Sequence, residues 1–190
     1  IGAGLTARRI IESGVLGRLV ESEGAFSRFR PGIRPGSWRD TGKAGGGTVY
    51  DLGIHLADQA LELFGMPSEV YGEVATQRDG ATVNDFFLIR MYYPDGLRVG
   101  LRGGFLMKEP LPSIMVHGTL GSYVKTSKDV QETALKAGQR PGEPWWGEEN
   151  KSDWGILNII SPEGEQRRRY PSLPGNYGEF YKNIYAHLRE

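Results

Sequence analysis

The chain has 190 residues, 38% of them hydrophobic, and a mean hydropathy of −0.42, a composition typical of a globular protein with one sizeable core. Its 23 lysine and arginine residues balance 23 aspartate and glutamate residues, so no net field would attract nucleic acid or an anionic membrane. The absence of cysteine excludes disulfides, zinc thiolate sites and thiol nucleophiles. No apolar run approaches the ~20 residues that cross a bilayer, so we expect a cytoplasmic protein that binds a small ligand.

The first elements expected are a short helix at 6–13, which ends at Gly14, and a half-buried strand at 19–29. Residues 2–7 match a glycine-rich dinucleotide-binding pattern, and Glu21 follows at the distance where an acid would hold a ribose. However, only Ile1 precedes this run, where the pattern needs a strand, and a loop rich in proline, glycine and arginine follows at 31–47. We therefore expect a frayed terminus that leads into a helix, and no nucleotide site.

A long helix is predicted over residues 45–65, after a run of three glycines. Apolar residues recur along it at spacings of four, four and three, which places one stripe against a core; they are Leu52, Leu56, Ala60 and Leu63. Everything else in the chain is expected to be arranged around this helix.

Three polar side chains of the same helix, Asp51, His55 and Asp58, project from one side beside the apolar stripe. An imidazole passes a proton near neutral pH, and a carboxylate one turn away can orient it, so this is general-base chemistry. Two carboxylates and an imidazole could instead hold a divalent cation, or the pair could simply tie the helix in place. The spacing alone leaves these three interpretations open.

The rest of the chain is typical of successive strands, expected at 70–77, 85–93, 97–106, 113–117, 122–126, 156–160 and 166–170. Tight turns are expected at 93–96 and 161–164, a long loop at 138–153 and a final helix, cut short, at 177–190. Because few helices separate the strands, we predict an α+β fold with a large open, mainly antiparallel mixed sheet and helices on one face. The other face, with Phe87, Ile89 and Met91, is expected to be solvated or covered by another subunit.

Several segments together resemble the second domain of the glucose-fructose oxidoreductase, inositol dehydrogenase and MocA (GFO/IDH/MocA) family of NAD(P)-dependent oxidoreductases. They are residues 14–19, 26–31, 38–39 and 45–59, of which Asp-x-x-x-His after the glycine run is the most specific. The resemblance implies that residues 1–190 are a single C-terminal domain for substrate binding and oligomerisation. It also implies that an N-terminal Rossmann domain, which binds NAD or NADP in the full-length protein, is missing from this chain.

The resemblance assigns roles to particular residues. His55 matches the family's catalytic histidine and Asp51 the acid one turn before it, and we expect Trp38, Arg39 and Trp145 to shape a substrate pocket. The implied reaction transfers hydride between a nicotinamide and a sugar or polyol carbon, while His55 takes the hydroxyl proton. No cofactor-binding residue and no metal ligand is assigned in this chain.

The family's Glu-Lys-Pro motif would lie in the missing domain, and the run Lys108-Glu109-Pro110 has these residues in another order. The isolated chain is therefore expected to form a homodimer or homotetramer through the open sheet face, but neither to bind NAD(P) nor to turn over. Two other functions remain open: a non-catalytic binding or scaffold protein of the same fold, and a metal-dependent enzyme that uses the Asp51, His55 and Asp58 face.

Overall fold

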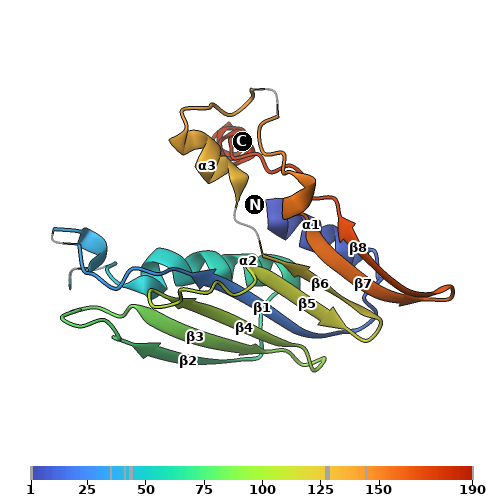
Figure 1. Ribbon diagram of the computed structural model, residues 1–190, viewed down its shortest axis with the longest axis horizontal. Helices are drawn as coiled ribbons and strands as arrows, with labels where there is room; N and C mark the ends of the chain where they lie inside the picture. The colour runs from blue at the N-terminus through green and yellow to red at the C-terminus, as the bar shows by residue number, and fades with distance from the viewer. Residues whose placement is uncertain are drawn as a thin grey trace.

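One mixed sheet of eight strands forms the body of the described part of the chain (Figure 1). The computed structural model describes residues 2–34, 36–40, 42, 45–126, 129–143 and 145–189. The strands lie in the order β2-β3-β4-β1-β5-β6-β7-β8, close to their predicted positions. Their bounds are β1 (Leu19–Ser27), β2 (Glu69–Ala75), β3 (Phe86–Tyr92), β4 (Arg98–Gly104), β5 (Ile114–Gly118), β6 (Gly121–Lys125), β7 (Gly155–Ser161) and β8 (Gly164–Tyr170).

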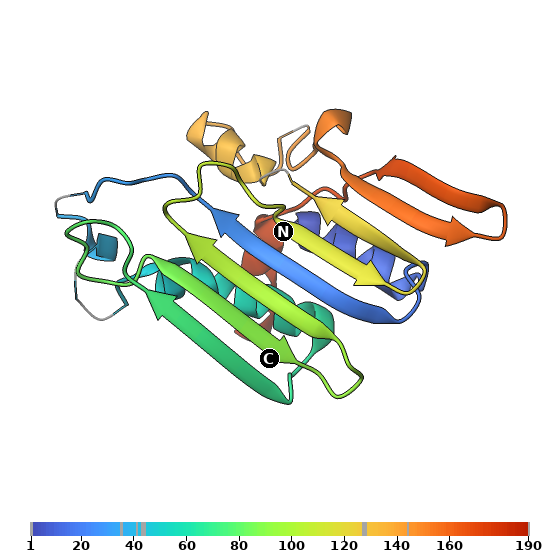
Figure 2. The same cartoon turned by 60° about the horizontal axis from the view of Figure 1, so that its bottom comes forward.

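Helices α1 (Gly2–Glu12) and α2 (Ile54–Phe64) lie together on one face of this sheet, and Figure 2 shows the opposite face toward the viewer. The neighbours β1 and β4 run parallel, whereas the other neighbouring strands of the described sheet run antiparallel. This confirms the predicted α+β fold with an open, mostly antiparallel mixed sheet. None of the described helices is long and apolar enough to span a membrane.

The turn between β3 and β4 is the predicted one. The Gly96 N–H donates to the Tyr93 carbonyl at 3.1 Å, and Gly96 has φ +91°, a backbone conformation that glycine adopts without a steric penalty. This turn fixes the register, with Tyr92 opposite Arg98. The hairpin in turn determines which side chains of β3 reach the core.

The main core lies between α2 and the first half of the sheet, and it corrects one prediction. Three residues of the predicted stripe are buried, Leu52 just before α2 and Leu56 and Ala60 within it, whereas Leu63 is half-buried. Phe87, Ile89 and Met91 pack against this stripe, so they face the helices and not the open side of the sheet. The alternate residues of β3 are mostly apolar as well, and Arg90 among them is the one sequence signal that this face is the open one.

The structure also differs from the prediction in two short helices. Helix α1 begins at Gly2, so the expected frayed terminus is wrong. A Cβ atom at Gly4 would lie 2.8 Å from Nε2 of Gln59 on α2, and the glycine thus permits close packing of the two helices. Helix α3 (Val130–Lys136) was not predicted; Asp129 caps it by accepting a hydrogen bond from the Gln131 N–H at 2.9 Å.

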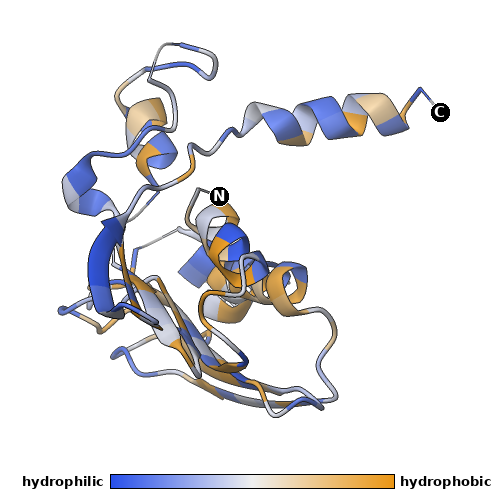
Figure 3. Ribbon diagram, turned by 90° about the vertical axis from the view of Figure 1, so that its right-hand side faces the viewer, coloured by the Kyte–Doolittle hydropathy of each residue, from blue (hydrophilic) through white to orange (hydrophobic). Residues whose placement is uncertain are grey.

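The final helix, α4 (Gly178–His187), stands away from the sheet and buries none of its residues (Figure 3). Its apolar side chains are exposed; they are Phe180, Tyr181, Ile184, Tyr185 and, just beyond it, Leu188. The helix itself was predicted. Because it stands apart from the sheet, the residues that line the hollow between α3 and the start of α2 come from other elements.

Candidate active site

The central helix consists of a first turn, Val49–Gly53, followed by α2. Hydrogen bonds hold its start against the loop between β2 and β3. Asn84 accepts the Thr48 N–H at its main-chain oxygen (2.9 Å) and the Val49 N–H at its side-chain oxygen (3.1 Å). Gly47 has φ +92°, and a Cβ atom there would lie 2.6 Å from Nδ2 of Asn84. The last glycine of the run is therefore needed both for its conformation and for the close approach of Asn84.

The first turn of the central helix is wound as a π-helix, Val49–Gly53, in which the Ile54 N–H bonds to the carbonyl of Val49. Such single π-turns inside α-helices are frequent at functional sites. Asp51 lies within this turn and His55 lies just after it, so the wide turn sets the direction in which both side chains leave the helix.

Asp51 is held by an arginine from the preceding loop. Nε of Arg39 lies 2.8 Å from Oδ1 of Asp51, whose side chain is only 15% exposed, and the Arg39 guanidinium also covers the Trp38 ring at 4.4 Å. Helical spacing places Asp51 one turn before His55, but it does not reveal the ion pair with Arg39. The ion pair holds the Asp51 carboxylate in place at the hollow, which both side chains line.

His55 is exposed and has no hydrogen-bond partner among the described residues. Its ring is free to bind a ligand, and it lines the same hollow as Asp51 and Asp58, as the helical spacing predicted. This hollow has a volume of about 1190 Å³ and lies on the helix side of the sheet. In the described part of the chain, no three histidine or acidic side chains are grouped so that they could hold a metal ion.

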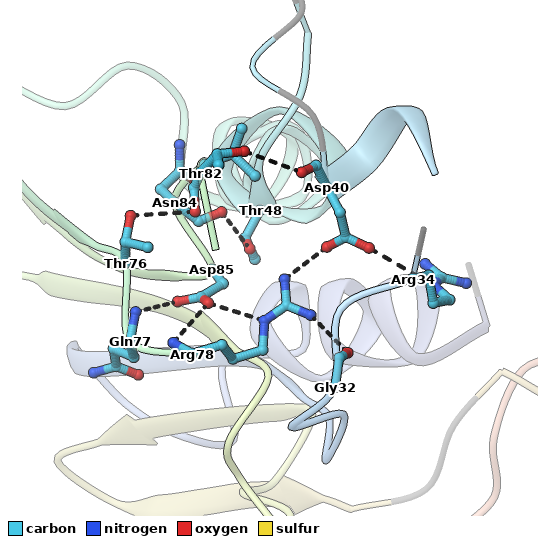
Figure 4. A network of polar contacts seen from close by, with 11 residues as sticks. Gly32, Arg34, Asp40, Thr48, Thr76, Gln77, Arg78, Thr82, Asn84 and Asp85 are labelled. Atoms are coloured by element: carbon cyan, nitrogen blue, oxygen red, sulfur yellow. Dashed lines mark hydrogen bonds and ion pairs between the residues drawn. The ribbon is translucent and has the colours of Figure 1, made fainter. Parts of the chain in front are cut away.

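The loop that carries Arg39 is anchored by a buried cluster of three charges, which we call the Arg78 cluster: Arg78, Asp40 and Asp85 (Figure 4). Arg78 donates from Nη2 to Asp40 at 2.6 Å, from Nε to Asp85 at 2.9 Å and from Nη1 to the Gly32 carbonyl at 3.2 Å. The three charged side chains are between 1% and 4% exposed. The flanking carboxylates raise the pKa of Arg78 against the effect of burial.

The Arg78 cluster joins two loops that lie far apart in the sequence. Asp85 also accepts the main-chain N–H groups of Gln77 (2.7 Å) and Arg78 (3.0 Å), and the Thr82 hydroxyl donates to the Asp40 carbonyl at 3.3 Å. Asp40 follows Arg39 directly, so the cluster fixes the main chain beside the Arg39–Asp51 ion pair. Sequence reasoning missed these residues, because no local pattern relates positions 40, 78 and 85.

The opposite wall of the hollow is built around a buried lysine at the end of β6. Lys125 is 1% exposed, and its Nζ donates to Oε2 of Glu149 at 2.6 Å and to the Asp153 carbonyl at 2.9 Å. The long predicted loop is thereby tied to the sheet. A buried ammonium that is fully paired in this way is a structural anchor of the wall.

The two tryptophans assigned to the pocket do not line the hollow as the structure has it. Trp38 is 51% exposed and stacks on Arg39, and Trp145 is 80% exposed with φ +69°. Neither is among the residues that line the hollow, whereas Arg39 is. Their roles in substrate binding stay predictions.

An open mixed sheet with helices on one face defines an α+β domain, and an aspartate and a histidine one turn apart at a polar hollow form its candidate site. More specifically, the chain belongs to the GFO/IDH/MocA C-terminal domain family, whose sequence profile matches residues 5–124. It is 38% identical over 180 residues to the uncharacterized oxidoreductase YdgJ of Escherichia coli (strain K12), covering 95% of this chain and 51% of that protein.

Two further relatives come from Bacillus subtilis. The chain is 34% identical over 186 residues to the scyllo-inositol 2-dehydrogenase (NADP(+)) IolW of strain 168, covering 98% of this chain and 51% of that protein. The solved structure of yvaA superposes with a TM-score of 0.92 at 33% identity, over 100% of this chain and 53% of that one. The chain thus spans about half the length of the curated relatives that it matches.

Proposed function

We propose that this chain is the substrate-side domain of an NAD(P)-dependent oxidoreductase that transfers hydride between the nicotinamide and a carbon of a sugar or polyol. The observation that carries the proposal is the unpartnered His55 ring beside the anchored Asp51 carboxylate, both at the hollow. The family and the inositol dehydrogenase among the relatives support it.

In the proposed reaction the substrate hydroxyl lies between the two side chains of the central helix. His55 accepts the hydroxyl proton at a ring nitrogen while hydride leaves the same carbon, and it returns the proton in the reverse direction. The Asp51 carboxylate accepts a hydrogen bond from a neighbouring hydroxyl, and the hydrogen bond from Arg39 orients that carboxylate. The nicotinamide supplies the hydride acceptor and, when reduced, the donor.

The glycine-rich run at the start of the chain does not fit a dinucleotide. The glycine-rich run lies inside α1, and a Cβ atom at Gly2 would lie 2.8 Å from the Leu173 carbonyl oxygen, so residues 173–175 cover that end of the helix. A pyrophosphate needs such a helix end to be open. We therefore propose that this run does not bind the cofactor and that the cofactor binds elsewhere in the full-length protein.

Two measurements test this function. The full-length protein is expected to reduce NAD or NADP with at least one inositol, aldose or linear polyol, and absence of turnover on such a panel would favour a binding or scaffold role. The isolated chain is expected to show no saturation when NADH is titrated and its fluorescence is followed. Saturable binding at micromolar NADH would contradict our placement of the cofactor site.

We propose further that the open sheet face, which Figure 2 shows, joins subunits into a homodimer or homotetramer. Its β4 residues include Arg98 and Arg102, and its β1 and β2 residues include Glu21 and Glu69, so a two-fold arrangement can bring opposite charges together. Arg98→Glu should shift the sedimentation coefficient toward a monomer, whereas Arg140→Glu, on an exposed loop, should not. An unchanged coefficient for Arg98→Glu would place the interface elsewhere.

A further inference from the structure

A row of arginines follows β1 along the rim of the hollow. Beyond the end of the strand, the Arg28 N–H bonds to the Gly104 carbonyl at 3.1 Å and the Arg30 N–H to the Phe105 carbonyl at 2.7 Å, so this segment remains extended. Alternation along an extended segment puts Arg28 and Arg30 on the side of Phe26, which packs toward the helices. Both arginines line the hollow together with Asp51 and His55.

The following loop brings two more guanidinium groups to the same rim. Arg39 pairs with Asp51 at 2.8 Å, and Nε of Arg34 lies 3.8 Å from Oδ2 of Asp40, a carboxylate that Arg78 already binds. Among the described residues, neither Arg28 nor Arg30 has an ion-pair partner. The rim next to Asp51 therefore has more cations than carboxylates, although the chain as a whole is neutral.

The arginines are close enough to affect one another. Burial lowers the pKa of Arg30, and the neighbouring charges of Arg28, Arg34 and Arg39 lower it further, while Asp51 acts in the opposite direction. Like charges gathered at the rim of a partly enclosed hollow cost free energy that an anionic ligand would remove. Guanidinium groups bind carboxylate and phosphate through paired, charge-assisted hydrogen bonds.

We propose that the substrate of this oxidoreductase carries a carboxylate or phosphate group, which Arg28 and Arg30 bind while its reacting hydroxyl lies at His55. The substrate class is thereby narrowed from sugars and polyols in general to sugar acids or phosphorylated polyols. This inference rests on the proposed function. The basic rim adjoins Asp51 directly, so a single small molecule can reach both the arginines and the catalytic pair.

The test compares matched neutral and anionic compounds with the full-length protein at saturating cofactor. The pairs are D-glucose with D-glucuronate and myo-inositol with myo-inositol 1-phosphate. For at least one pair, we expect kcat/KM of the anionic compound to be about tenfold or more above that of the neutral compound. The neutral compound cannot form the charge-assisted hydrogen bond to the arginines, and such a bond accounts for a difference of this size. Arg30→Gln should lower this ratio about tenfold, whereas Arg18→Gln, an exposed arginine at the start of β1, should leave it unchanged.

A binding measurement separates this inference from the proposed function. Calorimetric titration with D-glucuronate and with inorganic phosphate should show binding to the wild-type protein and to Arg18→Gln, and weaker binding to Arg30→Gln, whether or not the compounds are turned over. Turnover that favours the neutral members, with no binding of either anion, would overturn the anion site and leave the dehydrogenase intact. A rise in cofactor KM for Arg30→Gln, with an unchanged substrate ratio, would assign the arginines to the cofactor phosphates and also overturn it.

Discussion

Replacement of His55 by alanine in the full-length protein is expected to lower kcat by ~10²- to 10⁴-fold, the usual cost of losing a positioned general base. The effect should fall on the rate more than on folding, because His55 is exposed, has no hydrogen-bond partner among the described residues and lies beside the buried stripe instead of within it. Steady-state kinetics with the best substrate of the panel, together with a thermal unfolding curve, would measure both quantities.

The matched control for this change is His187→Ala, which removes an exposed histidine from α4, where its Nδ1 lies 2.9 Å from the Asn183 carbonyl. It should leave kcat within about twofold of wild type, because surface substitutions away from a site have small effects. Asp51→Asn should also reduce turnover, since it removes the negative charge that Arg39 orients. Wild-type turnover by His55→Ala would exclude His55 from the reaction.

Replacement of Arg78 by methionine is expected to be the most destabilising single change in the described part of the chain, by about 3–5 kcal/mol. Methionine removes the positive charge but leaves both carboxylates buried, Asp85 with no ion-pair partner among the described residues and Asp40 with only Arg34, at 3.8 Å. Asp85 keeps its two main-chain N–H donors, so most of the penalty should arise at Asp40. Urea unfolding of the 190-residue chain, followed by circular dichroism, measures the free energy.

Arg78→Lys and Arg140→Met are the controls. Lysine keeps the charge but cannot bridge Asp40, Asp85 and the Gly32 carbonyl at once, so its loss of stability should be intermediate. Arg140 lies on an exposed loop, and Arg140→Met should change the free energy of unfolding by less than about 0.5 kcal/mol. If Arg78→Met unfolded at the same urea concentration as Arg140→Met, the Arg78 cluster would not support the loop that carries Arg39.

Much of the fold was predictable because its determinants are local. The stripe of Leu52, Leu56 and Ala60 has the period of a helix, the turn before Gly96 has the chemistry of a hairpin, and alternation identified β1. The prediction was wrong for β3, where Arg90 is the single charged residue and apolar residues stand on both faces. Packing against α2 decides that Phe87 faces the core. Likewise, the glycines at the start of the chain lie in a helix whose partners are distant in sequence: Gln59 of α2 lies against Gly4, and the Leu173 carbonyl lies against Gly2.

The candidate site was also predictable in part: the residues on one helix could be placed from the sequence, but their contacts with other segments could not. Asp51, His55 and Asp58 could be placed together from the sequence, because helical geometry relates residues that are three or four positions apart. The residues that surround these side chains come from loops and strand ends. They are Arg39, which pairs with Asp51, Asn84 at the start of the helix, and Arg30 at the rim of the hollow. The sequence by itself thus determined which residues share a helix face and which family the chain resembles. Only the tertiary structure decided their charge partners, because ion pairs such as that of Asp40 with Arg78 depend on chain segments that meet in space without any periodic relation in sequence.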